Sequence, residues 1–205
     1  MDGQRGKRFT RAFHGASRVQ ALRVQAPHER LETRHNPGVS PDAKASALRR
    51  SAGWLLLPPL LFNLALYDRL PPTFAAERFD ADIPAWLLTS EMVLRIACFG
   101  LLFVGRLGLA DPHQRVGAGL YLVGLGVYFA SWWAHIAEPD GAWSSSLLGF
   151  TAPAWTASLW LGSALLMLEG PLFGSPQRLR ELCGASALLF MVVHVAHAWL
   201  AHPGA

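Results

Sequence analysis

From Ser51 to the C-terminus, the chain alternates apolar stretches with short polar connections. A helix rises about 1.5 Å per residue, so about 20 apolar residues cross the roughly 30 Å of hydrocarbon in a bilayer. Stretches close to that length lie at residues 51–67, 83–109, 116–137, 147–168 and 182–201. The pattern predicts an all-α fold, an integral membrane bundle of five transmembrane helices.

The first stretch, 51–67, is the weakest of these candidates. It is short, and Pro58 and Pro59 remove two backbone donors, so we expect a kink there. The stretch also has the character of a signal peptide, although no good small-x-small cleavage site follows it. The alternative architecture therefore has four spans after a cleaved first segment.

Residues 1–50 carry most of the positive charge, with 11 of the 18 Lys and Arg residues and only 4 of the 14 acidic residues. They contain few bulky apolar residues, so we predict a disordered, basic cytoplasmic tail before a transmembrane domain at 51–205. An Arg-rich, acid-poor opening is also typical of an organellar transit peptide. Because the charge directly precedes apolar sequence, cytoplasmic retention or anionic lipid explains it, and we expect no nucleic-acid partner.

The charges of the connections predict an orientation. Connections 106–115 and 169–181 contain arginines, whereas 68–82 is mainly acidic and 138–146 has no basic residue. Lys and Arg near helix ends are retained on the cytoplasmic side. We therefore expect a multi-pass protein, most simply of a bacterial inner (plasma) membrane, with its N-terminus inside and its C-terminus outside.

With this orientation, polar side chains from four segments fall at a similar depth in the outer half of the bilayer. They are Asn63 in the first segment, Glu91 in the second, His135 in the third, and His194 and His197 in the fifth. Ionisable groups inside a membrane are costly and commonly functional. The shared depth predicts a pocket that accepts a lipid-soluble small molecule.

His194 and His197 are spaced i and i+3, so both imidazoles face one side of a helix. Neutral imidazole is the commonest protein metal ligand, and haem needs one or two such rings, usually from different helices. We therefore consider His194, His197 and His135 as cofactor ligands for haem or a divalent metal. The alternative is that these histidines form hydrogen bonds between packed helices.

Glu91 and Arg95 have the largest free-energy cost of insertion into a membrane, about 2.5–3.5 kcal/mol for each charge near a helix centre. Their i, i+4 spacing allows each to neutralise the other on one helix face. In a functional interpretation, either Arg95 anchors an anionic ligand or Glu91 donates a proton. In a structural interpretation, the pair fixes the packing of the bundle interior.

The third segment has a polar stripe at helical spacing. A stripe of this kind is typical of a cavity wall or of a close contact between helices, and the abundant glycines of this segment favour the close contact. The residues of the stripe are Tyr121, Gly124, Tyr128, Ser131 and His135.

Two classes of function fit these patterns. The first is a membrane-embedded enzyme or redox protein, in which Glu91, Arg95 and His135 perform acid–base chemistry on a lipid-soluble substrate. The second is a non-catalytic component, such as a small transporter, carrier or assembly partner, in which the same residues serve helix packing. Either class is compatible with a homo-oligomer or a hetero-oligomer.

Overall fold

The computed structural model describes residues 46, 48–172 and 176–204, and these are mostly helical. Three helices are long and apolar enough to cross a membrane: α4 (Ala85–Val104), α5 (Pro112–Ala137) and residues Arg178–Leu200 of α9 (Pro176–Leu200). The all-α class is thus confirmed, and the lengths and apolar composition of these three helices indicate a membrane association. The predicted disorder of the basic tail falls almost entirely outside the described residues, and it stays a prediction.

Shorter elements complete the described part of the chain. Before α4 lie the 3-10 helix η1 (Ala52–Leu56), α2 (Leu57–Leu66), η2 (Tyr67–Arg69), η3 (Pro72–Phe74) and α3 (Ala76–Phe79). After α5 lie α6 (Ala142–Ser145), α7 (Leu147–Phe150) and α8 (Ala152–Leu166). Two short strands, β1 (Gly105–Leu107) and β2 (Leu168–Pro171), pair in antiparallel fashion.

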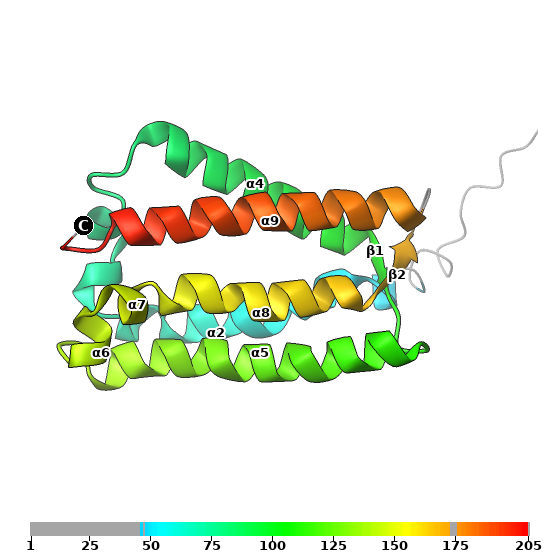
Figure 1. Ribbon diagram of the computed structural model, residues 1–205, viewed down its shortest axis with the longest axis horizontal. Helices are drawn as coiled ribbons and strands as arrows, with labels where there is room; N and C mark the ends of the chain where they lie inside the picture. The colour runs from blue at the N-terminus through cyan, green and yellow to red at the C-terminus, as the bar shows by residue number, and fades with distance from the viewer. Residues whose placement is uncertain (1–45, 47, 173–175, 205) are drawn as a thin grey trace, which may run out of the picture. The chain divides into compact units, whose positions relative to one another are not determined.

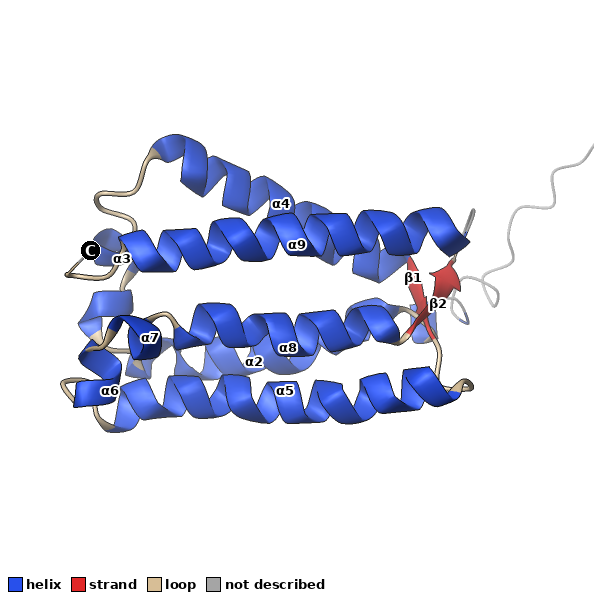
Figure 2. Ribbon diagram, in the orientation of Figure 1, coloured by secondary structure: helices blue, strands red, loops and turns tan. Residues whose placement is uncertain are grey.

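The helices run side by side between two ends (Figures 1 and 2). We call the end with β1 and β2 the sheet end, and the end with α3, α6 and the C-terminus of α9 the carboxyl end. Helix α4 contacts α9, α5 contacts α8, and α8 and α9 join the two pairs, while α2 packs on α5. The acidic connections lie at the carboxyl end and the arginine-containing connections at the sheet end.

Apolar side chains cover much of the outside of this bundle, and several polar ones lie inside it. Leu64, Leu122 and Leu188 are each at least 67% exposed, whereas Glu91 and His135 are at most 3% exposed. In water, such an exterior is a large exposed apolar surface, which soluble monomers rarely present. The distribution is the one that a lipid environment favours.

Pro58 and Pro59 follow a change of helix type, and the kink expected there stays a prediction. The chain is a 3-10 helix up to Leu56 and an α-helix from Leu57, so both prolines lie in the first turn of α2. The N–H groups of a first helical turn have no intrahelical acceptor, so proline costs little there.

Three of the expected segments have other boundaries in the structure, and for the second and the fourth the reason is identifiable. The second stretch, expected to run to 109, leaves the helix after Val104 because Gly105–Leu107 forms β1. The fourth, expected as one segment over 147–168, is divided at Thr151 into α7 and α8, with Pro153 in the first turn of α8. The fifth begins earlier than expected, at Pro176.

A small hydrogen-bonded ribbon closes the sheet end. Strand β1 pairs with β2, and Ser51 forms an isolated bridge with Arg106. The N–H of Leu107 donates to the carbonyl of Arg50 at 2.7 Å, and the Ser51 hydroxyl donates to the carbonyl of Phe103 at 2.6 Å. The start of η1 is therefore fixed to the connection between α4 and α5.

The polar stripe expected on the third segment is confirmed as one buried face of α5. Its five residues, Tyr121, Gly124, Tyr128, Ser131 and His135, are all buried. A Cβ built at Gly124 would lie 2.7 Å from the backbone nitrogen of Trp160 on α8. The close contact that the glycines favoured is therefore made at Gly124, where α5 meets α8.

This contact predicts opposite effects for two glycines on the same helix. Gly124→Ala should destabilise the protein by about 1–3 kcal/mol, because the new methyl group meets backbone that cannot move aside. Gly126→Ala is the matched control, because a Cβ there meets nothing within 4 Å and alanine is the better helix former. Unfolding of the detergent-solubilised variants, followed by circular dichroism, measures both. Equal stability of the two variants would contradict the contact.

Candidate functional site

Glu91, on the buried face of α4, is the centre of a polar cluster. Its side chain is only 5% exposed. Its Oε1 accepts a hydrogen bond from Arg95 in an ion pair along α4, and a second one from Nδ1 of His194 at 3.0 Å. Its Oε2 lies 2.5 Å from Nδ1 of His197. One carboxylate therefore holds three cationic or ionisable partners.

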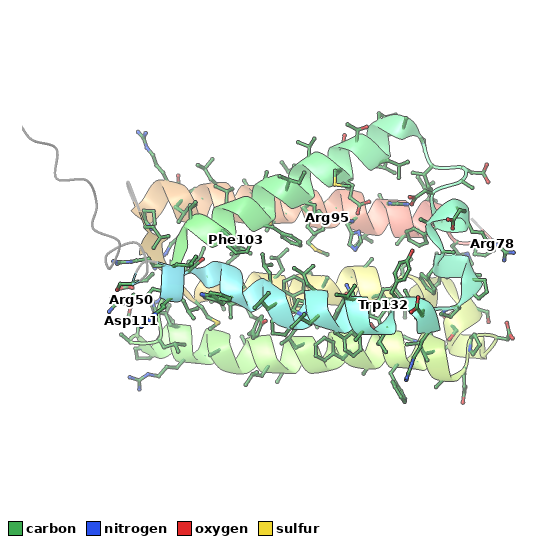
Figure 3. All side chains as sticks on the ribbon, turned by 180° about the vertical axis from the view of Figure 1, so that it is seen from behind. Arg50, Arg78, Arg95, Phe103, Asp111 and Trp132 are labelled. Atoms are coloured by element: carbon green, nitrogen blue, oxygen red, sulfur yellow. The ribbon has the colours of Figure 1, made fainter. Side chains whose placement is uncertain are left out.

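Helical periodicity explains why these side chains meet. Glu91 and Arg95 are one turn apart on α4, and His194 and His197 are one turn apart on α9. Because α4 and α9 pack against each other, the two pairs face across a single helix contact. Figure 3 shows Arg95 about halfway along the bundle, between Phe103 towards the sheet end and Trp132 towards the carboxyl end.

His197 has protein oxygen atoms beside both of its ring nitrogens. Nδ1 faces Glu91, while Nε2 lies 3.2 Å from Oδ1 of Asp80 and 3.4 Å from the carbonyl oxygen of Phe79. The Phe79 ring also packs on the imidazole, with centroids 4.7 Å apart. The segment that leads from α3 into α4 thus covers the outer side of this histidine.

His194 differs from His197, because only one of its nitrogens is held. Nδ1 donates to Glu91, and within the described part of the chain no hydrogen bond holds Nε2. Phe190, one turn earlier on α9, stacks on the imidazole with centroids 5.2 Å apart and rings 13° from parallel. The guanidinium of Arg95 lies 5.7 Å from the centroid of the same Phe190 ring, within cation–π range. The imidazole is therefore fixed in orientation and keeps one nitrogen free.

Two cavities adjoin this imidazole, and we call them cavity A and cavity B. Cavity A has a volume of about 160 Å³ and cavity B about 170 Å³. His194, Asn63 and Tyr128 line both of them. Cavity A is also lined by Arg95, Phe99, Ala157, Trp160 and Phe190, and cavity B by Phe74, Phe79, Trp132, Phe150 and Ala154.

The polar side chains that line the cavities include several hydrogen-bond donors. The Tyr128 hydroxyl donates to Oδ1 of Asn63 at 2.8 Å, which leaves the Asn63 amide nitrogen as a donor. Trp160, in the wall of cavity A, has a buried indole N–H without an acceptor among the described residues. Arg95 adds a guanidinium, which only donates. The arrangement suits a molecule that presents oxygen atoms as acceptors.

His135 is the one sequence-predicted site residue that the structure keeps apart from the cluster. Its Nε2 lies 2.9 Å from the carbonyl oxygen of Gly149, and its ring packs against Phe74, with centroids 4.9 Å apart. It lines neither cavity A nor cavity B, but a separate pocket of about 470 Å³ at the carboxyl end. The structure therefore brings together Glu91, Arg95, His194 and His197.

The geometry does not bring the predicted histidine ligands together around one haem or metal position. Among the residues that the structure describes, no group of three or more His, Cys, Asp and Glu side chains is placed to hold a metal ion. Both nitrogens of His197 and one nitrogen of His194 already face oxygen atoms of the protein, and a ligating nitrogen needs its lone pair turned to the metal. His135 is not positioned to complete a pair with His194.

Asp80 belongs to the cluster but was not among the sequence-predicted site residues. It lies in the acidic stretch 77–82, which by its pattern is typical of a solvated connection or of a weak cation site. Its contact with His197 depends on how the loop after α3 folds back over α9. The periodicity of the sequence does not indicate that this loop folds back over α9.

The fold and the site define a helical protein whose described residues include three helices long and apolar enough to cross a membrane, with an ionisable cluster in its interior. The chain matches no protein-family model, and neither curated proteins nor solved structures give a significant match. The function is therefore argued from the site itself.

Proposed function

We propose that this chain is a multi-pass membrane protein that binds a lipid-soluble small molecule in cavities A and B and exchanges a proton with it at His194. The observation that carries the proposal is the Glu91–His194 pair. A carboxylate on Nδ1 fixes the tautomer and orientation of an imidazole, so that its Nε2 is available as acid or base. Because His194 lines both cavities, a bound molecule lies within reach of its ring.

The chemistry of the walls supports an amphiphile with an oxygen acceptor, such as a carbonyl compound. Both cavities are lined mainly by aromatic and aliphatic side chains; Asn63 and His194 line both, and the donors Arg95 and Trp160 line cavity A. Each cavity is smaller than the about 300–1,000 Å³ of a typical ligand pocket, so a narrow molecule extending through both fits best. Leu60, which lines cavity A, is also 46% exposed on the apolar surface, and this favours entry from the lipid.

The proposed topology has five spans, with the sheet end in the cytoplasm of a bacterial cell and the carboxyl end outside. η1 and α2 together extend about 25 Å and α8 about 22 Å, and both run beside the three long helices. Tyr121 donates to the carbonyl of Leu55 at 2.5 Å, and Tyr128 donates to Asn63. These bonds support a retained first segment rather than a cleaved signal peptide, because cleavage would leave both hydroxyls without their acceptors.

The competing hypothesis is a non-catalytic component in which the cluster only fixes the packing of α4 on α9. It predicts that filling the cavities has no consequence beyond stability. The two hypotheses can therefore be distinguished by whether a small molecule co-purifies with the protein and is lost when the cavities are filled.

Filling the cavities should remove the bound molecule. Ala157→Leu reaches into cavity A and Ala154→Leu into cavity B, whereas Ala97→Leu adds the same volume on an exposed position of α4. We expect one small molecule to co-purify with the wild type and with Ala97→Leu, and to be lost from both cavity variants. Organic extraction of the gently purified proteins, followed by mass spectrometry, measures it.

Circular dichroism of the same samples separates loss of the molecule from loss of the fold. A wild type that carries only bulk lipid, or cavity variants that keep the molecule, would contradict the proposal.

A further inference from the structure

The cluster around Glu91 does not end in the bundle interior but continues to the surface. Oε2 of Glu91 lies 2.5 Å from Nδ1 of His197, and Nε2 of the same ring lies 3.2 Å from Oδ1 of Asp80. The Asp80 side chain is 45% exposed, whereas that of His197 is 6% exposed. A continuous series of proton-exchanging groups therefore joins the cavities to the solution at the carboxyl end.

Imidazole is suited to the middle position of such a series. It can accept a proton on one nitrogen and release another from the second. The Phe79 carbonyl, the other neighbour of Nε2, accepts a hydrogen bond but carries no exchangeable proton. Within the described residues, Asp80 is thus the exchanging group between His197 and the solution.

In the other direction, the interior is closed by apolar side chains. Towards the sheet end, the apolar side chains of Leu102 and Leu168 are fully buried and that of Leu161 is nearly so, and the buried Cys98 thiol lies among them. They belong to the hydrophobic core, which the polar cluster borders. Among the described residues, no series of hydrogen-bonded carboxylates and imidazoles leads from Glu91 to the sheet end.

We infer that Asp80, His197 and Glu91 form a proton path that connects His194 with the aqueous phase at the carboxyl end alone. The inference rests on the proposed function only in taking His194 as the group that meets the ligand. It adds a direction to that function, because every proton taken from or given to the ligand passes through one side of the membrane.

The transfer balances with one proton per passage. A protonated His194 gives its Nδ1 proton to the Glu91 carboxylate, which becomes a carboxylic acid. Glu91 takes the proton on Oε1, and rotation of the acid group presents it to Nδ1 of a neutral His197, whose Nε2 proton leaves through Asp80 to water. His194 ends neutral, Glu91 and Asp80 end as carboxylates, and His197 ends neutral with its proton on Nδ1. Before the next passage in the same direction, rotation of the His197 ring returns its proton to the side of Asp80. The reverse sequence delivers a proton.

The charged surroundings of the path are few. Arg95 on α4 pairs with Glu91, and Tyr128 on α5 lines the cavities beside His194. Helices α2 and α8, which the structure describes in full, contribute no titratable side chain to the walls of cavities A and B. The protonation of the cluster therefore depends on Glu91, His194, His197 and Asp80, in the field of Arg95.

Asymmetric acidification of lipid vesicles tests the path directly. The protein is reconstituted in one known orientation, the pH is lowered on one side only, and infrared difference spectra follow the Glu91 carboxyl and the histidine rings. The bands are assigned by their absence in Glu91→Gln and His194→Gln. We expect a prompt response to acid at the carboxyl end and none to acid at the sheet end before the gradient decays.

The variants Asp80→Asn and Asp82→Asn provide the matched pair. In Asp80→Asn, the amide keeps the shape and the hydrogen-bonding oxygen of the carboxylate but cannot take up a proton, so the prompt response should be lost. Asp82 is exposed on the same connection, and its variant should respond as the wild type does. Equal responses from the two sides, including none from either, would overturn the inference, as would identical behaviour of the two variants. Because the spectra need no ligand, this outcome is independent of the co-purification result.

Discussion

Glu91→Ala should destabilise the protein by about 3–5 kcal/mol, the largest loss that we expect from any single substitution here. The carboxylate is buried and holds Arg95, His194 and His197. Removing one partner of a buried ion pair leaves the other charge uncompensated in a medium of low dielectric constant. Three groups lose their partner at once, and two of them lie on the opposite helix. Unfolding in mixed detergent micelles, followed by circular dichroism, gives the free-energy change.

Two further variants identify the cause of that loss. Glu138 is exposed at the end of α5, so Glu138→Ala should change the stability by no more than about 0.5 kcal/mol. Arg95→Ala should cost less in the Glu91→Ala background than in the wild type, because the pair is already broken there. Additive losses from the Glu91→Ala and Arg95→Ala substitutions would show that the ion pair contributes nothing to the fold.

Cysteines placed at the two ends should react from opposite sides of the membrane, and this effect is all or none. Asp140→Cys and Gly204→Cys lie at the carboxyl end, and His113→Cys lies at the sheet end, all at exposed positions. With the proposed orientation, an impermeant thiol reagent added to intact bacterial cells labels the first two and not the third. After lysis, all three should be labelled.

The natural cysteines give little background in this assay. Cys98 and Cys183 are free and at most 1% exposed, so the unmodified chain serves as the negative control. Labelling of His113→Cys alone in intact cells would reverse the topology and place the proposed proton path on the cytoplasmic side. Labelling of all three before lysis would mean that the chain does not separate two compartments as proposed.

The sequence predicts the helices of this protein better than it predicts the site. Apolar stretches of membrane length are a strong signal, because the thickness of the hydrocarbon fixes how long they must be. The spacing of Glu91 with Arg95 and of His194 with His197 likewise places each pair on one helix face. The two pairs meet because α4 contacts α9. No local sequence pattern predicts that contact.

Three features of the structure could not be predicted from the sequence for the same reason. The position of Asp80 beside His197 depends on a loop, whereas a depth estimate treats each residue only by its distance along a helix. The separation of His135 from the other histidines depends on the angle at which its side chain leaves α5, towards Gly149. The β1–β2 ribbon is too short to give an alternating pattern. Depth was a good guide to the cluster, but it carries no information about which way a side chain points.

The ribbon at the sheet end has a consequence for the order in which the chain can be assembled during synthesis. β1 leaves the ribosome well before β2, with α5 and α8 made in between, and translation at about 5–20 residues per second separates the two strands by several seconds. During that interval, the backbone groups of Gly105–Leu107 that later pair with β2 have no partner strand. The α4–α5 pair is therefore made before the ribbon can form, and the ribbon closes only after α8 and β2 have been made.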